Sequence, residues 1–252
     1  MKKQGCDWHN KIFAAAANGS HFELLKWLKE NGCLSLENIC FKAVCHPTVM
    51  HWLIIQGYIV NQQTLRCAVK HGLFDLLSWL QSMGCALPLK EEICDLLAEN
   101  GHLSALIKLK EYWTERTFAA AAKGGHLEIL LHLTDNGCPW NANISQKAAK
   151  NGQLEILTWL KENEHLAISE ESVFDILARK PYLKVIKRLR AKGWNWNSEV
   201  CMIAAERGHY YLLKWLITNG CPWNEEVIEM AEKQGFPSAW LKKLEMEIES
   251  KD

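Results

Sequence analysis

The sequence predicts an all-α solenoid of about eight to nine helix-turn-helix repeats. Three observations support this: a segment that recurs about every 27 residues, apolar positions with helical spacing inside each copy, and glycines where the helices should end. The copy at residues 204–224 reads AAERGHYYLLKWLITNGCPWN. Because each repeat of a solenoid contacts only its neighbours, we expect residues 1–252 to form a single domain.

A tryptophan followed by leucine marks the copies and sets their period. The steps between successive markers run from 24 to 29 residues. Five copies carry the tryptophan, and a lysine, a histidine or an arginine replaces it in three others; the markers are Trp27, Trp52, Trp79, Lys108, His132, Trp159, Arg188 and Trp215.

The first helix of each repeat is typified by residues 224–234, where Asn224 stands at the capping position and acidic residues fill the first turn. Alanine pairs at 16–17, 121–122, 148–149 and 204–205 make this helix thin, which predicts that the first helices line a concave side. Glycines that supply a left-handed residue after this helix recur as Gly72, Gly101, Gly125, Gly152 and Gly208.

The second helix is typified by residues 209–219, in which Leu212, Leu213 and Leu216 form a core face. The second copy lacks the turn glycine, so its first helix should be short and Pro47 should open its second helix. The fourth copy lacks the glycine link, and the irregular copies are either degenerate repeats or local kinks. Residues 236–252 are expected to form a C-terminal capping helix.

Composition narrows the class of protein. Basic and acidic residues number 29 each, so no net field attracts nucleic acid or anionic lipid. No apolar segment is long enough to span a membrane, and no apolar leader follows Lys2 and Lys3. Ten cysteines without a C-x-x-C motif indicate free thiols, no metal site and a reducing compartment. We therefore expect a soluble cytoplasmic protein.

The recurring pattern A-A-x-x-G-H-L-E-x-L-x-x-L-x-x-x-G resembles the helical half of the ankyrin repeat along nearly the whole chain. The link G-C-P-W-N at residues 137–141 and 220–224 resembles the short, Trp-rich ankyrin repeats of large DNA viruses of amoebae and some protists. An ankyrin unit usually has about 33 residues, and the missing residues fall where that family carries its β-hairpin finger. The resemblance implies an ankyrin-like solenoid with reduced or absent fingers.

Candidate chemistry is sparse. The resemblance implies that His21, His102, His126 and His209 hydrogen-bond backbone at the turn between the two helices of a repeat. Their spacing of 24 or more residues argues against a shared metal ion. No catalytic triad, phosphate-binding loop or dinucleotide-binding motif is present, so we predict neither enzyme activity nor a cofactor.

The tryptophan markers form a ladder along the second helices, and they are either binding anchors or packing between repeats. Because the same place accepts Lys108, His132 and Arg188, packing at an edge is the preferred interpretation.

A basic stripe follows the alanine positions, where ankyrin repeats commonly contact partners. Completion of helix dipoles would equally place cations at these helix ends. The stripe, opposed by Glu99 and Glu206, consists of Lys70, His71, Lys123, Lys150, Arg179, Lys180, Arg207 and Lys233.

The sequence therefore predicts a non-enzymatic scaffold, monomeric, that binds a partner protein on its concave face. If the chain is viral, the partner would be a host protein. The alternative is a binder of nucleic acid or another polyanion through the basic stripe.

Overall fold

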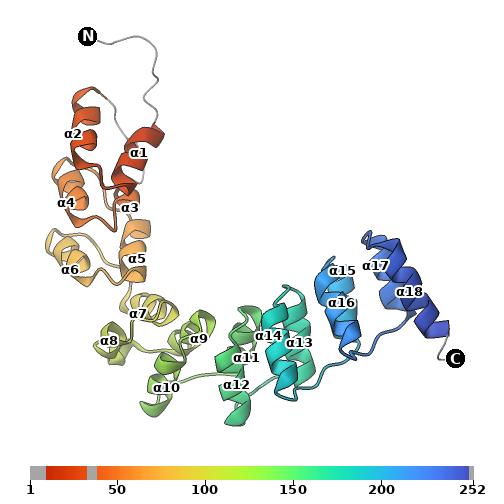
Figure 1. Ribbon diagram of the computed structural model, residues 1–252. Helices are drawn as coiled ribbons and strands as arrows, with labels where there is room; N and C mark the ends of the chain where they lie inside the picture. The colour runs from red at the N-terminus through yellow and green to blue at the C-terminus, as the bar shows by residue number, and fades with distance from the viewer. Residues whose placement is uncertain (1–9, 33–38, 250–252) are drawn as a thin grey trace. The chain divides into compact units, whose positions relative to one another are not determined.

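A computed structural model describes residues 10–32 and 39–249, and that part of the chain contains eighteen α-helices and no strand (Figure 1). The helices follow one another as pairs, one pair for each predicted repeat. The contacts divide the chain into two compact units, residues 1–113 (unit 1) and 114–252 (unit 2), which are treated separately below. The predicted all-helical repeat fold is confirmed.

Unit 1 holds four helix pairs. Their first helices are α1 (Asn10–Asn18), α3 (Ile39–Lys42), α5 (Gln62–Lys70) and α7 (Lys90–Glu99), and their second helices are α2 (Phe22–Glu30), α4 (Pro47–Ile55), α6 (Phe74–Ser82) and α8 (Leu103–Ile107). A short 3-10 helix, Lys110–Tyr112, follows α8.

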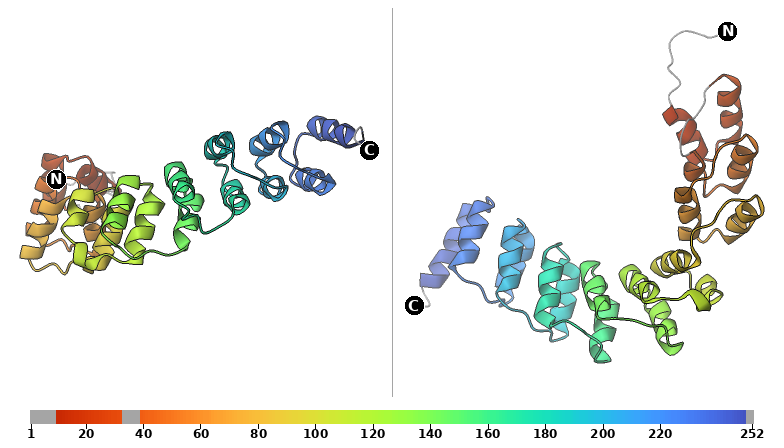
Figure 2. Two further views of the ribbon diagram at one scale, coloured as in Figure 1. Left: turned by 90° about the horizontal axis from the view of Figure 1, so that it is seen from below. Right: turned by 180° about the vertical axis from the view of Figure 1, so that it is seen from behind.

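Unit 2 holds five pairs. Their first helices are α9 (Glu115–Gly124), α11 (Asn143–Lys150), α13 (Glu170–Ala178), α15 (Glu199–Glu206) and α17 (Glu225–Lys233), and their second helices are α10 (Leu127–Asp135), α12 (Leu154–Glu162), α14 (Leu183–Ala191), α16 (Tyr210–Thr218) and α18 (Ser238–Glu249). Figure 2 shows the two helices of these pairs as two layers. In the region predicted as a capping helix, α18 packs on α17, and residues 250–252 lie outside the described part.

The first helices are the closely packed layer of each unit. In unit 2, α9, α11, α13, α15 and α17 contact one another in succession, and α1, α3, α5 and α7 do so in unit 1. Alanine makes this approach possible, since Ala121, Ala122, Ala148 and Ala149 are all fully buried. The second helices contact one another less, apart from α12 and α14.

The tryptophan ladder packs between successive second helices. The Trp79 ring lies 4.9 Å from the His51 ring of the preceding pair, centroid to centroid. Similarly, the Lys187 ammonium lies 5.4 Å from the Trp215 ring of the following pair. Burial of an indole against a side chain of the previous repeat is the packing role that the sequence favoured.

The local predictions for the second repeat are confirmed, whereas some predictions for other repeats need correction. Helix α4 does begin at Pro47, and α3 spans four residues. Asn224 occupies the capping position before α17, but its side chain accepts no hydrogen bond from that helix. Helices α16 and α17, predicted at residues 209–219 and 224–234, each begin one residue later and end one residue earlier than predicted, because terminal residues lack a helical partner.

The glycines after the first helices adopt positive φ as predicted, including Gly152 at 66° and Gly208 at 69°. These two occupy the same place in their repeats but differ in surroundings. A Cβ at position 152 would lie 3.0 Å from the Tyr182 ring, whereas a Cβ at 208 would meet nothing within 4 Å.

We therefore predict that Gly208→Ala costs about 1 kcal/mol of unfolding free energy, the usual penalty for a side chain in this conformation. Gly152→Ala should cost at least about 1 kcal/mol more, because it also displaces an aromatic ring. Urea denaturation of the two variants checks this. Equal costs would show that the approach of Tyr182 is unimportant.

Candidate partner-binding stripe on the first helices

The structure places every residue of the predicted basic stripe at the C-terminal end of a first helix, with its side chain exposed. Six of the eight lie in unit 2: Lys123, Lys150, Arg179, Lys180, Arg207 and Lys233. Because the five first helices of unit 2 pack in succession, these ends form a row. Lys70 and His71 belong to unit 1, so the structure does not bring them together with the other six.

Hydrogen bonds between repeats hold this row in register. The residue directly before a second helix, here called the corner residue, reaches back to a carbonyl at the end of the preceding first helix. His102 Nε2 lies 2.8 Å from the Lys70 carbonyl oxygen, and Gln153 Nε2 donates to the Lys123 carbonyl at 2.8 Å. The Tyr182 hydroxyl lies 3.3 Å from the Lys150 carbonyl oxygen.

Two further corner bonds lie nearer the ends of the described chain. His209 Nε2 lies 3.4 Å from the Arg179 carbonyl oxygen, and His46 Nε2 lies 2.8 Å from that of Asn18. The predicted turn bonds of His102 and His209 are thus confirmed, and their acceptors are backbone groups of the previous repeat. The His21 side chain makes no hydrogen bond within the described residues.

Sequence reasoning missed three corner donors, His46, Gln153 and Tyr182, because it looked for a histidine directly after a turn glycine, and His46 follows Cys45. For Gln153 the position directly after a turn glycine, and for Tyr182 the position after Pro181, was the available signal. Any side chain that carries a donor at the right reach satisfies the carbonyl. The corner is therefore a position defined by geometry.

The stripe residues contribute through both their backbone carbonyls and their side chains. Four of their carbonyls, which the helix leaves without an internal partner, accept corner bonds: those of Lys70, Lys123, Lys150 and Arg179. Their side chains extend into solvent and place positive charge at the negative end of the helix dipole. The Lys180 ammonium lies 3.3 Å from the Lys150 carbonyl oxygen and so strengthens the same end.

Not every position of the stripe carries a basic side chain that extends into solvent. Glu206 occupies the position equivalent to Lys150 in its repeat, so Arg207 supplies the cation one residue later. The His71 ring is turned back, with Nδ1 2.8 Å from the Cys67 carbonyl oxygen. His71 is therefore engaged at the end of its own helix.

An acidic group that the sequence did not single out lies beside the stripe. The pKa of the Asp175 carboxyl in α13 is raised to about 6, mainly by burial and next by the Glu199 carboxylate, with Glu171 adding to the effect and Arg179 opposing it. Its Oδ1 is buried and has no hydrogen-bond partner among the described residues. Burial depends on how α13 and α15 pack, which no local pattern reports.

The cysteines are free thiols throughout the described residues, whereas Cys6 and Cys33 lie outside that part. Cys40, Cys94 and Cys201 are fully buried and behave as small hydrophobic residues, while Cys67 is only half-buried. A hydrogen bond with Cys221 and burial both raise the pKa of the Cys201 thiol. Because Cys201 and Cys221 occupy different places in the repeat, an alignment of the repeats does not reveal this contact.

Two further classes of site are absent from residues 10–32 and 39–249. No three His, Cys, Asp or Glu side chains gather there in a way that could hold a metal ion. No helix there has the length and apolar character needed to cross a membrane.

Comparison with known proteins yields a fold-level likeness. No family model and no curated protein matches the chain. Among solved structures, it is similar to the crystal structure of a pentatricopeptide repeat protein from maize, with 14% sequence identity and a TM-score of 0.36. The match covers 90% of this chain and 46% of the maize chain, so the chain spans about half the length of that protein. A likeness of this size carries no information about a ligand.

Asp175→Asn should stabilise the protein at pH 8 by on the order of 1 kcal/mol, a value reduced for the partial exposure of the carboxyl. Because the folded-state pKa exceeds the ordinary value of 3.8, ionisation destabilises the fold, increasingly as pH rises from about 4 to about 6. The gain should therefore be constant above pH 7 and nearly absent at pH 4. Urea denaturation at both pH values measures it, and the exposed Asp75→Asn should show no such gain.

Proposed function

We propose that the chain is a non-enzymatic scaffold that binds a partner protein through the basic stripe on its first-helix layer. The observation that carries this proposal is the set of corner bonds, which anchors successive stripe residues at their backbone while leaving their side chains exposed. Fixed spacing of several cations favours a partner with acidic groups at matching intervals.

The preorganised backbone lowers the conformational entropy cost of such binding. A cation at the end of an anchored helix loses side-chain freedom on binding but requires no reordering of the main chain. One exposed ion pair contributes under about 1 kcal/mol, so affinity requires several stripe residues together. Unit 2 supplies six of them in one row.

We further propose that the repeats are of the short, Trp-rich ankyrin type. Corner residues bonded across repeats and alanine-lined first helices support this, along with the sequence pattern. With no strand in the described links, the binding surface would consist of helices. Ten cysteines, eight of them free thiols in the described part, favour a reducing compartment such as the cytoplasm.

A polyanion such as nucleic acid is the second candidate, favoured by the row of cations alone. Acidic residues oppose it. Glu206 interrupts the row, and each first helix of unit 2 except α11 begins with an acidic residue in its first turn. A face with both charges suits a protein surface better than a continuous phosphate backbone.

Charge reversal tests the proposal. Replacing Lys123, Lys150 and Arg207 by Glu should weaken capture of the partner from native cells at least about tenfold. The melting temperature should fall by only a few degrees, since each helix dipole contributes at most about 1 kcal/mol. Quantitative mass spectrometry of captured proteins and differential scanning calorimetry give the two readouts.

A matched control carries the same change of charge on the second-helix layer, at Lys184, Lys214 and Lys243. It should capture partners like the unaltered protein. If the stripe variant retains capture and melts early, the cations only complete helix dipoles. Capture that nuclease treatment abolishes would instead favour the nucleic-acid alternative.

A further inference from the structure

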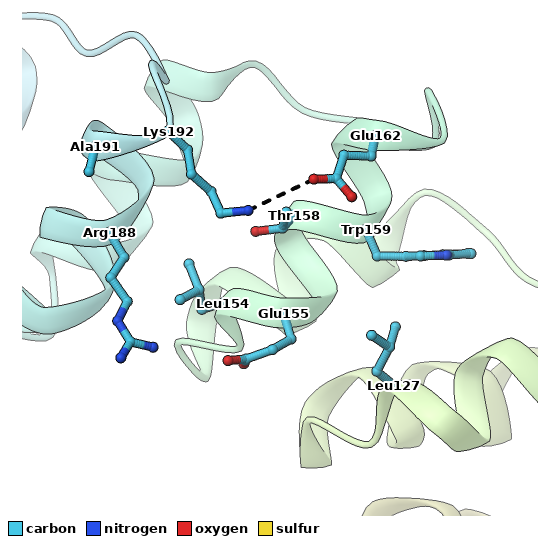
Figure 3. Close-up of a pocket in the computed structure, with 9 residues that line it drawn as sticks. All are labelled: Leu127, Leu154, Glu155, Thr158, Trp159, Glu162, Arg188, Ala191 and Lys192. Atoms are coloured by element: carbon cyan, nitrogen blue, oxygen red, sulfur yellow. Dashed lines mark ion pairs between the residues drawn. The ribbon is translucent and has the colours of Figure 1, made fainter.

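The second-helix layer of unit 2 contains a groove that the repeat pattern leaves unfilled. It lies between α12 and α14, has a volume of about 530 Å³, and is mainly apolar at its base (Figure 3). Leu127, Leu154 and Trp159 supply apolar walls, while Arg188 and Lys192 stand on the α14 side. This groove belongs to neither the basic stripe nor the first helices.

Other seams between second helices show what normally occupies this position. In two seams the marker tryptophan covers the fifth residue of the helix before it: Trp79 lies against His51, and Trp215 lies beneath Lys187. At the α12–α14 seam the fifth residue is Thr158, and the marker is Arg188 instead of tryptophan. The indole that covers the fifth residue in those two seams is absent here, and the groove lies at that point.

The groove also leaves polar groups without partners. Thr158 Oγ1 is buried and unbonded within the described residues, whereas Thr134 and Thr218 donate to the carbonyl four residues earlier at 2.9 and 3.0 Å. Arg188 and Glu155 form no ion pair among the described residues. Lys192 pairs with Glu162 at 3.8 Å across the groove, as Figure 3 shows.

We propose that the α12–α14 groove is a socket for a tryptophan side chain of a partner protein. The occupant is identified by the chain itself, because an indole lies at the corresponding position in the α4–α6 and α14–α16 seams. The ring would lie over Thr158, whose Oγ1 is buried and has no hydrogen-bond partner among the described residues. Arg188 would lie against the ring or pair with an acidic residue next to the tryptophan, and Glu155 on the opposite wall would pair with a basic one.

The larger groove of unit 1, about 700 Å³ between α4 and α6, is a different case. Its marker Trp79 is present and packs against His51 with the ring planes tilted by 38°, so no indole is missing from that seam. The α12–α14 groove thus combines an unfilled marker position with unpaired charge on both walls.

The test uses a short peptide with 5-fluorotryptophan between aspartate and lysine, and the same peptide with the two charges exchanged. Titration of the full-length protein is followed by ¹⁹F NMR. We expect saturable broadening of the fluorine signal with a dissociation constant on the order of 1 mM or tighter, the range for one buried side chain. A peptide with alanine in place of tryptophan, competing at equal concentration, should not displace the probe.

Arg188→Trp is the decisive variant, because it restores the missing indole from within the chain. It should weaken peptide binding at least tenfold and raise the melting temperature. Lys184→Trp, on the same helix outside the groove, is the matched control and should bind like the unaltered protein. If Arg188→Trp folds poorly, Ala191→Arg, at an exposed position on the groove wall, should obstruct entry and weaken binding with helix content unchanged.

Three results would overturn the socket: failure of the peptide to bind, equal competition by the alanine peptide, or unaltered binding by Arg188→Trp. A second copy of the chain is the remaining occupant to distinguish. If sedimentation shows a dimer that Arg188→Trp dissociates, the tryptophan comes from another copy and the partner-protein assignment is wrong.

Discussion

The corner hydrogen bond is the interaction on which the arrangement of this protein depends. A helix end leaves carbonyl groups without internal partners, and in this chain the next repeat supplies the donor. Gln153, Tyr182 and His209 perform this role in unit 2 for three successive first helices. Stacking of alanine faces brings the helices together, but it is nondirectional. The corner bond adds the direction that fixes one repeat against the next.

The two helix layers carry different surfaces as a result. First helices approach closely through alanine, so their exposed ends form a regular row of charged side chains. Second helices are bulkier, and large side chains such as Trp79 and Trp215 pack in the seams between them. Where the marker is Arg188, the seam stays open. The first-helix layer therefore presents a periodic row of charged side chains, whereas the second-helix layer has a groove where one repeat departs from the pattern.

Most of the fold follows from the sequence because repetition amplifies weak local signals. A single Gly-His corner or Trp-Leu pair means little, yet eight aligned copies establish helix order, turn glycines and the position of the basic stripe. The groove follows less directly. The substitution of Arg188 for tryptophan is visible in the sequence, but the vacancy over Thr158 appears only when α12 and α14 are placed together.

What the sequence does not predict are contacts between unlike positions of different elements. Asp175 is exposed or buried according to how α15 packs on α13, and its raised pKa depends on Glu199 there. Cys201 and Cys221 are twenty residues apart and occupy different places in the repeat, so an argument from equivalent positions passes over their contact. Gln153 replaces histidine at a corner, so only its place directly after Gly152 marks it.

Removal of one corner donor tests the central claim most directly. Gln153→Leu takes away the amide that donates to the Lys123 carbonyl, and Leu73 already occupies a corner in unit 1, so the shape is tolerated. Hydrogen exchange and urea denaturation should show a loss of about 1 kcal/mol, with faster exchange at the end of α9, relative to the exposed Gln146→Leu control. Unchanged stability and exchange in Gln153→Leu would contradict the account.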